Sequence, residues 1–520
     1  MLDSILSSLT LTRVLVFLVA WAAISKVVAV FLTARKVRQL GHQAAIRRTW
    51  LPFSIDIIAE VIYYALNNRN YEFWCDMFRR YGNPAAPHTV EAGELADRTI
   101  LTCDPENIKA ILATQFADYG KGEEFNREWK AFLGDSIFTT DGQKWHESRT
   151  LIRPQFIKGR VSDLATFERH IAPLTELFGG AGQTVNVAEL FLRYTLDAAT
   201  DFLFGRSVES LMNPQAQFAH AFTVVQHVQS MIARAGPFTF LIPRGEFNKQ
   251  LRVINEFVHP FIEQALLLSP QELEEKTKSD EGYTFLHALA SYTRDRTVLR
   301  DQLVAVLLAA RDTTAGTLSW AFYELSRQPH IVSKLREEIL RRVGKTKLPT
   351  YDDLKEMKYL QHILNETLRL YPAVPFNVRV SLKDTTLPRG GGPNGDLPIG
   401  VFEGTQVGYS PLVMQRHPDM YPPESSGFPP VEKFVPERWD HWTPKTWTYI
   451  PFNGGPRICI GQQFALTEMA YTVVRVFQRF ASVESRMPGQ EPGLNTDIVL
   501  QPTRGVRVAF WEDKNNEGQW

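Results

Sequence analysis

The segment Pro451-Phe-Asn-Gly-Gly-Pro-Arg-Ile-Cys-Ile-Gly461 is the most informative part of the chain. Within it, Cys459 stands directly before a helical pattern that starts near Gly461. A thiolate at a helix N-terminus is stabilised by the helix dipole and by backbone N–H groups, which lower its pKa. Gly454, Gly455 and Gly461 let the backbone approach a large flat group closely. The segment therefore predicts a thiolate that faces such a group.

Cysteine usage narrows the chemistry of this thiolate. The 520 residues contain three cysteines, Cys75, Cys103 and Cys459. Three cysteines are too few for a disulfide framework, and an odd number cannot all pair within the chain. One cysteine cannot hold a zinc ion or an iron–sulfur cluster alone, and neither of the others lies close in sequence. A single axial thiolate to a haem iron satisfies every feature of the segment. The alternative is a buried, inert cysteine in a tight turn.

Four motifs together resemble those of one enzyme superfamily. Phe452-x-x-Gly455-x-Arg457-x-Cys459-x-Gly461 resembles the haem-binding loop of the cytochrome P-450 superfamily. The others, in the expected order, are Trp145-x-x-x-Arg149, Glu366-Thr-Leu-Arg369 and the meander Phe434-x-Pro436-Glu437-Arg438-Trp439. The resemblance extends from about Tyr81 to Phe510. It implies the cytochrome P-450 fold, a haem b cofactor and Cys459 as the axial iron ligand.

The resemblance also implies which residues bind the haem. Phe452 belongs to the loop around the cofactor, and Arg149, Arg457 and Arg379 pair with the haem propionates. Because Trp145 and Arg149 are one helical turn apart, an indole N–H and a guanidinium can point at the same anionic group. Such partners are needed because two carboxylates leave water when the haem binds.

A second group of charged residues has a structural interpretation. Glu366 and Arg369 are three residues apart on one helix face, and Arg438 of the meander can join them. One carboxylate shared by two guanidinium groups forms a buried network that stabilises the core around the cysteine loop. Its net contribution to stability can be small, since desolvation offsets the attraction.

The helical pattern over 298–328 carries the candidate catalytic residues. Its segment Ala309-Ala-Arg-Asp-Thr-Thr314 is similar to the oxygen-binding segment of the same superfamily. By this resemblance, Thr313 holds dioxygen or its waters through the hydroxyl, and Asp312 relays protons that allow O–O scission. Ala310 stands where glycine is more usual, so the oxygen groove carries an extra methyl group. The alternative is an Asp-Thr pair without a role, in which the threonine bonds back to the preceding turn.

Periodicity predicts a mainly α protein with a minor β-sheet. Helices are expected over 298–328, 354–371 and 461–480, strands over 98–103 and in a terminal pair around 497–500 and 506–510, and loops over 387–404 and 421–436. We expect one large catalytic domain. The proposed boundaries are a membrane anchor over 1–34, a basic linker over 35–60, the haem-thiolate domain over 61–511 and a polar, frayed tail over 512–520.

The N-terminal sequence predicts a membrane anchor. From Val14 to Ala34 the chain is apolar except for Ser25, Lys26 and Thr33, and a helix of this length reaches about 31 Å, enough to span a bilayer. Basic residues concentrate on its C-terminal side, so the positive-inside rule puts the catalytic domain in the cytosol. We expect a single-pass protein of the endoplasmic reticulum membrane. The alternative is an interfacial helix, because Lys26 interrupts the apolar run.

Charge and motifs limit the partners. The 57 basic and 57 acidic side chains cancel, which gives no positive field for nucleic acid. No nicotinamide- or flavin-binding motif is present in the sequence, so electrons are expected from NADPH through a separate membrane-bound reductase. Dioxygen and a hydrophobic small molecule are the expected reactants.

The substrate is the least defined property. Segments such as 309–315, 369–379 and 385–393 look like those of fungal alkane and fatty-acid terminal hydroxylases. Ala309, Val374 and Phe376 are candidate substrate contacts because they neighbour the motifs. The insertion at 421–430 departs from that pattern, so a tailoring monooxygenase of a fungal polyketide or terpenoid pathway is the main alternative. A haem-thiolate isomerase or dehydratase, or a non-enzymatic haem sensor, fits the intact Asp312–Thr313 pair less well.

Overall fold

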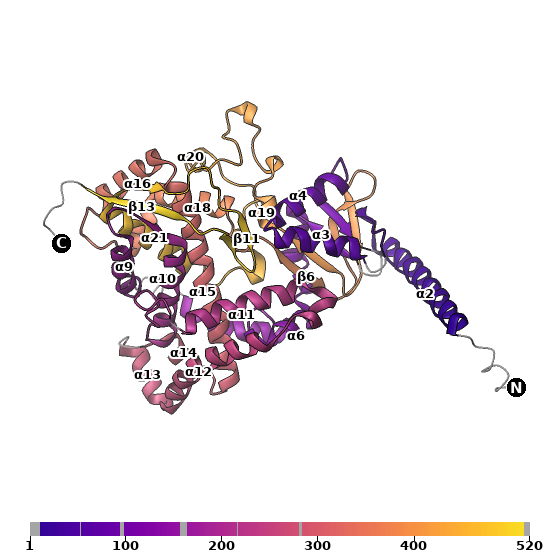
Figure 1. Cartoon of the computed structure of the whole chain (residues 1–520), viewed down its shortest axis with the longest axis horizontal. Coiled ribbons are helices and arrows are strands. Elements are labelled where there is room, and N and C mark those ends of the chain that lie inside the picture. The colour runs from indigo at the N-terminus through magenta and orange to yellow at the C-terminus, as the bar shows by residue number, and fades with distance from the viewer. Residues whose placement is uncertain are drawn as a thin grey trace. The chain divides into compact units, whose positions relative to one another are not determined.

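The computed structural model describes residues 11–51, 54–93, 98–156, 164–215, 217–279 and 283–513. The chain forms two compact units, labelled by element in Figure 1. The first unit comprises Met1–Leu66, Glu72–Gly120 and Val378–Tyr409, and the second comprises Asn67–Tyr71, Lys121–Asn377 and Ser410–Trp520. Each unit therefore joins segments that lie far apart in the sequence.

A six-stranded sheet organises the first unit, in the order β1-β2-β3-β9-β6-β4. The strands are β1 (Ala45–Arg47), β2 (Thr89–Ala92), β3 (Thr99–Thr102), β9 (Gln406–Tyr409), β6 (Asn377–Ser381) and β4 (Tyr119–Gly120). The helices are α3 (Ile55–Leu66), α4 (Asn70–Tyr81), α5 (Pro105–Lys109), the π-helix η3 (Ala110–Thr114) and the short η4 (Phe116–Asp118). β3 confirms the strand predicted over 98–103.

The range 387–404, expected as a loop, is mostly a β-hairpin. β7 (Thr385–Gly391) pairs antiparallel with β8 (Leu397–Val401). Gly392 and Gly395 have positive φ, at 75° and 67°, in the turn between the strands. Side chains rarely adopt this backbone conformation, so the glycines that suggested an irregular loop instead allow the chain to reverse.

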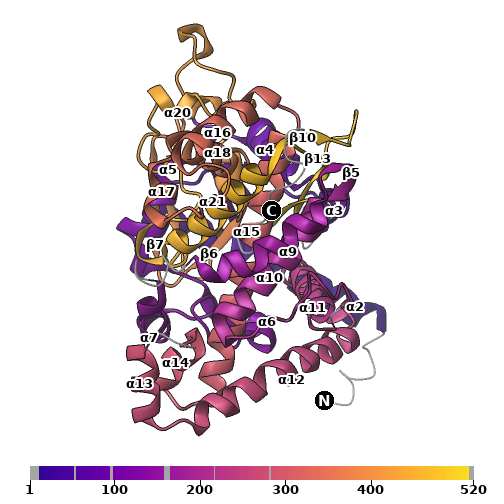
Figure 2. The same cartoon turned by 90° about the vertical axis from the view of Figure 1, so that its left-hand side faces the viewer.

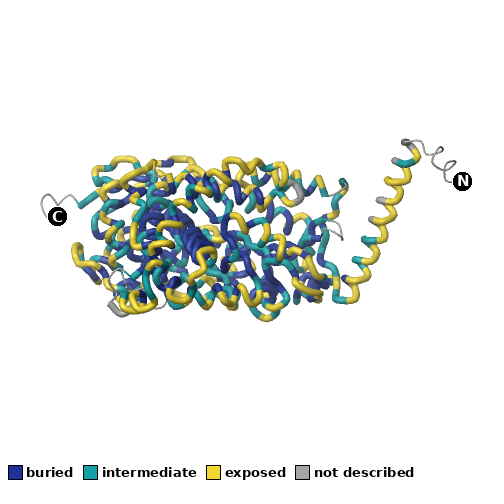
Figure 3. The backbone as a smooth tube through the Cα atoms, turned by 90° about the horizontal axis from the view of Figure 1, so that it is seen from below, coloured by how far each residue is buried: buried dark blue, intermediate teal, exposed yellow. Residues whose placement is uncertain are grey.

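Helix α2 (Leu11–Leu40) begins the described chain and continues beyond the expected end at Ala34. Its part Val16–Leu40 is long and apolar enough to cross a membrane, although a signal sequence meets the same criterion. Figure 3 shows α2 exposed along most of its length, and Val37 near its end is buried against Gly400 of β8. The expected linker over 35–60 contains the end of α2, strand β1 and the start of α3.

The second unit is built around α15 (Arg296–Leu325). The helix begins after Asp295, whose carboxylate accepts hydrogen bonds from the backbone N–H groups of Thr297 and Val298. Against α15 pack α10 (Val187–Phe204), α12 (Gly245–Leu267), α18 (Lys358–Leu370) and α21 (Gln462–Arg479). Figure 2 shows α21 with α10 and the neighbouring α9 (Ala165–Phe178). Helices α15 and α21 confirm the helices predicted over 298–328 and 461–480.

The third predicted helix, over 354–371, is divided in two. α17 (Tyr351–Glu356) ends at Met357, which has an extended backbone, and α18 begins at Lys358. A capping box between Thr350 and Asp353 starts α17 three residues before the predicted start. The remaining helices of this unit are α6 (Gly122–Leu133), α7 (Gly142–Ile152), η5 (Arg153–Phe156), α11 (Gln217–Arg234), η6 (Gly236–Leu241), α13 (Pro270–Ser279), α14 (Phe285–Tyr292), α16 (Pro329–Arg342), α19 (Pro411–Met414), η7 (Pro418–Met420), η8 (Glu424–Ser426), α20 (Arg438–His441) and η9 (Gly455–Arg457).

The terminal strand predicted around 506–510 exists, but the range 497–500 is a turn except for Leu500, and the predicted pairing between the two is wrong. β12 (Leu500–Pro502) pairs with β11 (Leu494–Thr496), whereas β13 (Arg507–Glu512) lies between β10 (Phe480–Ser485) and β5 (Ala181–Asn186). Strand alternation identifies a strand but does not select its partner. Of the predicted tail 512–520, residues 514–520 lie outside the described residues.

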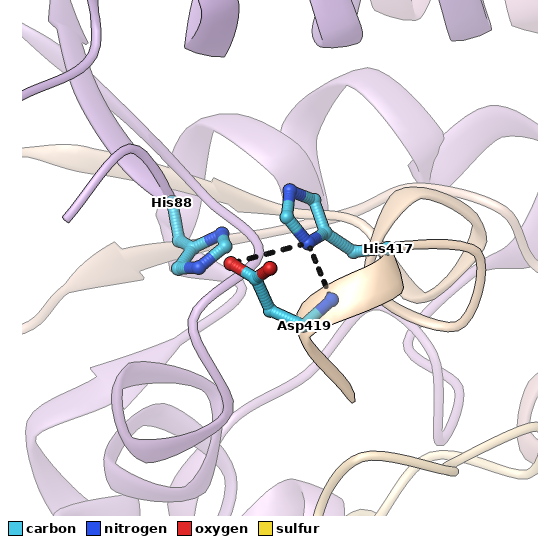
Figure 4. Close-up of side chains that lie close together, drawn as sticks. All are labelled: His88, His417 and Asp419. Carbon is cyan, nitrogen blue, oxygen red and sulfur yellow. Dashed lines mark hydrogen bonds and ion pairs between the residues drawn. The ribbon is translucent and has the colours of Figure 1, made fainter. Parts of the chain in front are cut away.

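Turns between α19 and α20 occupy the predicted loop over 421–436. Before this loop, the ring Nδ1 of His417 accepts a hydrogen bond from the backbone N–H of Asp419 at 3.3 Å, which caps η7 (Figure 4). Gln415 donates from its side chain to the carbonyls of Leu368 and Arg369, at 3.0 and 3.1 Å. The end of α18 and the following segment are thereby joined.

Candidate functional site

The cysteine loop has a strained, specific backbone path. The Cys459 backbone N–H donates to the Phe452 carbonyl at 2.9 Å, which closes the loop. Asn453 and Gly455 both have positive φ, at 65° and 64°. A Cβ on Gly454 would lie 2.5 Å from the Trp447 ring, so glycine is required there. The loop ends at Gly461, the N-cap of α21.

Cys459 is exposed, whereas Cys103 is buried and Cys75 is intermediate. An exposed thiol in a glycine-rich loop fits a ligand better than it fits an inert core cysteine. Although the residue has an exposed surface, desolvation by the protein atoms around its sulfur raises the pKa of Cys459, against the lowering effects of the Gly461 backbone N–H and the Arg149 charge. The expected net lowering is therefore wrong for the protein alone, because desolvation of the thiolate exceeds the stabilisation at the helix N-terminus.

Helix α7 brings Trp145 and Arg149 to this loop. Arg149 Nη1 donates to the Ile458 carbonyl at 3.1 Å, one residue before the cysteine. The Arg457 guanidinium lies 4.7 Å from the centre of the Trp145 ring. A cavity of about 440 Å³ adjoins them, lined by Trp145, His146, Arg149, Thr150, Arg153, Gly455 and Pro456. The structure thus brings together three of the four predicted propionate partners.

Asp141 is a contact that sequence reasoning missed. Arg457 Nη2 donates to Asp141 Oδ1 at 2.5 Å and to the Thr140 carbonyl at 2.8 Å. Asp141 is the N-cap residue of α7, four residues before Trp145. An aspartate directly before a helical pattern is the only sequence feature that could have identified it. The fourth predicted partner, Arg379, is buried on β6 in the first unit, so the structure does not place it relative to Cys459.

The predicted charge network is present and fully buried. Arg369 donates to both Glu366 carboxylate oxygens, at 2.8 and 2.9 Å, and Arg438 Nε donates to Oε1 at 2.8 Å. Trp439 Nε1 adds a hydrogen bond to Oε2 at 3.0 Å, and the Val435 backbone N–H adds one to Oε1 at 2.9 Å. The meander motif contained Trp439, but its contact with Glu366 was not predicted. One carboxylate thus connects α18 to the segment before the cysteine loop.

Helix α15 has a single open face in its buried part. Between Leu299 and Tyr323, every residue is buried except Ala309, Ala310 and Thr313. Positions i, i+1 and i+4 share one side of a helix, so these three residues form an open stripe. Ala310 belongs to this stripe, so its methyl group lies on the face that was expected to form the oxygen groove.

Thr313 and Asp312 face different surroundings. Thr313 Oγ1 donates to the Ala309 carbonyl at 2.6 Å, the local bond expected of a mid-helix threonine. Asp312 is buried and accepts a hydrogen bond from the Gln226 amide of α11. Thr313 therefore lies on the open face, whereas the carboxylate of Asp312 faces α11.

The candidate substrate residues are less well supported. Val374 is exposed, and Phe376 packs against the main core, in the segment that follows α18. This segment approaches α15 through β12, because the Leu500 N–H donates to the Ala373 carbonyl at 2.9 Å. Val374 and Phe376 stay predictions.

Glu468 of α21 is a buried acid that sequence reasoning did not identify. Its carboxyl is hydrogen-bonded to Thr314, next to Thr313 in sequence. Burial raises the pKa of Glu468 to about 8, and the Thr314 hydrogen bond opposes this only in part. Glu468 is therefore neutral at pH 7.

We predict that Glu468→Gln stabilises the protein as pH rises. The unfolded chain releases this proton above about pH 4.5 and the folded protein keeps it until about pH 8, so the wild type loses stability across that interval. The free energy of unfolding of the variant, relative to wild type, should increase by roughly 3 to 5 kcal/mol between pH 5 and 8. Urea unfolding at several pH values measures this, with exposed Glu337→Gln as control. A constant difference would contradict the burial of a neutral acid.

Comparison with known proteins decides the family. The family model for cytochrome P450 matches residues 58–510. This chain belongs to the cytochrome P450 family. It is an oxidoreductase that uses molecular oxygen, with haem iron on a cysteine thiolate and electrons from NADPH through a reductase. The exposed Cys459 thiol beside two arginines fits this cofactor.

The P450 has close fungal relatives. It is 49% identical over 500 residues to the cytochrome P450 monooxygenase pvhE of Talaromyces variabilis, covering 92% of each chain. It is 43% identical over 429 residues to cytochrome P450 52A13 of Debaryomyces hansenii, covering 79% of each. With cytochrome P450 52A1 of Candida tropicalis it shares 40% identity over 476 residues, covering 87% of this chain and 86% of the relative.

Proposed function

We propose that this P450 hydroxylates a long-chain alkane or fatty acid. The observation that carries the proposal is the open face of α15, formed by two alanines and one threonine. Such a face offers an unactivated carbon chain apolar contact and one hydroxyl group, without a charge that would require a polar substrate. The motif likeness to fungal alkane and fatty-acid hydroxylases supports the same class.

The proposed haem residues are Cys459 as ligand, Phe452 in the loop, and Trp145, Arg149, Arg457 and Arg379 at the propionates. Haem activates dioxygen when bound. Thr313 exchanges its hydrogen bond to the Ala309 carbonyl for one to dioxygen or water on the open face. Asp312 supplies protons toward the Thr313 hydroxyl. Ala309, Val374 and Phe376 contact the substrate.

We predict that Thr313→Ala uncouples the reaction. Without the hydroxyl, protons reach the open face less efficiently, so NADPH is spent on peroxide rather than on product. Product per NADPH should fall about 10-fold, less than the roughly 100- to 10,000-fold contribution typical of a proton-transfer group, because water can partly replace the hydroxyl. Simultaneous measurement of NADPH, peroxide and product checks this, with Thr317→Ala, one turn further along α15, as control. Unchanged coupling in Thr313→Ala would remove the proposed role.

The proposed location is the endoplasmic reticulum membrane, with one span and a cytosolic catalytic domain. The exposed apolar helix α2 supports an anchor within 1–34, with 35–60 leading to a catalytic domain over 61–511 and a tail over 512–520. In the second unit, Phe240 and Leu241 of η6 are 77% and 65% exposed beside Arg244, which suits contact with a lipid surface.

The proposed electron donor is a separate, membrane-bound NADPH-dependent flavoprotein reductase. Arg149 and Arg153 line the cavity next to the cysteine loop. Basic groups at this face suit an acidic partner surface. Docking there places the donor near Cys459.

A spectral titration tests the substrate class. Ferric protein is titrated with dodecanoic acid, hexadecane and a shorter, polar control such as butanoic acid. Long chains should displace the axial water and change the spin state, whereas butanoic acid should not. Absence of any shift with long chains, in protein with an intact thiolate spectrum, would reject this substrate class.

A second candidate is a tailoring monooxygenase of a fungal polyketide or terpenoid pathway. One observation favours it: the segment 421–430, which departs from the hydroxylase pattern, contains the turn η8. A spin-state change with polycyclic or polyene ligands, but not with hexadecane, would select this candidate.

A further inference from the structure

The Asp312 carboxylate has one hydrogen-bond donor and one ion-pair partner. It is 2% exposed, and its Oδ2 accepts a hydrogen bond from Gln226 Nε2. Its Oδ1 has no hydrogen-bond partner and lies 3.4 Å from Arg311 Nη1. A buried carboxylate normally requires several donors, and among the described residues Gln226 is the one that donates a hydrogen bond to this acid.

Arg311 is itself held by the same helix. Its Nη2 donates to Thr223 Oγ1 at 3.1 Å, and its guanidinium lies 5.4 Å from the centre of the Phe222 ring. On α11, positions 222, 223 and 226 share one face. This face of α11 therefore supports both the acid and the cation beside it. From α10, Thr195 contributes a hydrogen bond to the Arg311 carbonyl at 2.8 Å.

The far end of α11 contacts the turn between β11 and β12 and continues into η6. Ser230 and Arg234 contact Asp497 Oδ1, at 3.1 and 3.2 Å, in the turn between β11 and β12. Beyond Arg234 the chain passes directly into η6, with its exposed Phe240 and Leu241. A displacement of α11 would thus be felt at the Asp312 carboxylate.

We propose that Gln226 is a positioning residue for Asp312, so that the position of α11 controls when the acid supplies protons to the open face of α15. This inference rests on the proposed function of Asp312. With Gln226 in contact, the carboxylate is directed toward α11. When α11 shifts, the carboxylate loses its hydrogen-bond donor and becomes free to turn toward Thr313 or to take up a proton.

The test uses haem-loaded, full-length protein with three variants. Gln226→Leu removes the donor at similar volume, Gln226→Glu replaces it with a titratable one, and Gln229→Leu is the matched control. Gln229 lies on the same helix and is buried, but it donates to the Glu128 carbonyl at 3.2 Å instead. The ferrous carbon monoxide spectrum first verifies the thiolate in each variant.

Hydrogen–deuterium exchange of α11 is the first readout, and peroxide formed per NADPH with reductase and no added substrate is the second. Gln226→Leu should raise exchange over 217–234 several-fold and raise the peroxide yield, because the released acid supplies protons while no substrate is present to be oxidised, and neither effect should add to those of Asp312→Asn. Gln226→Glu should behave like wild type at low pH, where the protonated acid donates to Asp312, and like Gln226→Leu at high pH, where two carboxylates repel.

The outcomes separate the two proposals. If Asp312→Asn raises peroxide but Gln226→Leu does not, Asp312 keeps its role and the positioning inference is overturned. A pH profile of Gln226→Glu parallel to wild type overturns it as well. If Asp312→Asn has no effect on peroxide, the proposed proton role fails, while α11 exchange in Gln226→Leu still reports whether the contact holds the helix.

Discussion

Cys459→Ala is expected to abolish the strongly red-shifted Soret band of the ferrous carbon monoxide complex and all monooxygenase activity. The band depends on a thiolate ligand to the iron, and alanine offers no ligand. Among the three cysteines, only the Cys459 side chain is exposed, and it alone lies in the glycine-rich loop before α21. Loss of the band should therefore be complete rather than partial.

Cys103→Ala and Cys75→Ala are the matched controls for this experiment. Both should retain the band, because Cys103 is buried in the first unit and Cys75 lies on α4. Cys103→Ala can cost some stability through lost packing, so haem content is measured alongside the spectrum. An unchanged thiolate spectrum in Cys459→Ala would disprove the ligand assignment.

Glu366→Leu is expected to reduce the free energy of unfolding by about 3 to 5 kcal/mol. The substitution leaves the guanidinium groups of Arg369 and Arg438 buried without their shared carboxylate. It also removes the acceptor for the Trp439 indole. Because this network joins α18 to the segment before the cysteine loop, haem incorporation should decrease together with stability.

Glu124→Leu is the matched control, because Glu124 and Arg127 have the same three-residue spacing on α6 but are exposed. An exposed pair contributes at most about 1 kcal/mol. Urea unfolding and the haem-to-protein ratio measure both variants. Equal losses in Glu366→Leu and Glu124→Leu would show that the buried network has no special role.

Local spacing accounts for the features that the sequence predicted correctly. The cysteine loop, the Glu366–Arg369 pair and the helix over 296–325 follow from local spacing, since one helical turn or one tight loop contains the chemistry. Arg438 lies 72 residues from Glu366 and was identified through the meander motif. The hairpin β7–β8 was missed because its glycines indicate a turn, and the strands on either side carry weak alternation. Trp439 was identified as a residue of the meander motif, but its hydrogen bond to Glu366 was not predicted.

The sequence by itself determined the cysteine proposed to bind haem, the family, the apolar N-terminal helix and the central helix with its Asp-Thr pair. Each rests on short motifs of neighbouring residues, and the family on several such motifs in a fixed order along the chain. Only the tertiary structure decided that β12 and β13 belong to different sheets, that Glu468 is buried against Thr314, and that Gln226 holds Asp312. Each of these depends on packing between segments distant in the chain, and local periodicity contains no information about which distant segments meet.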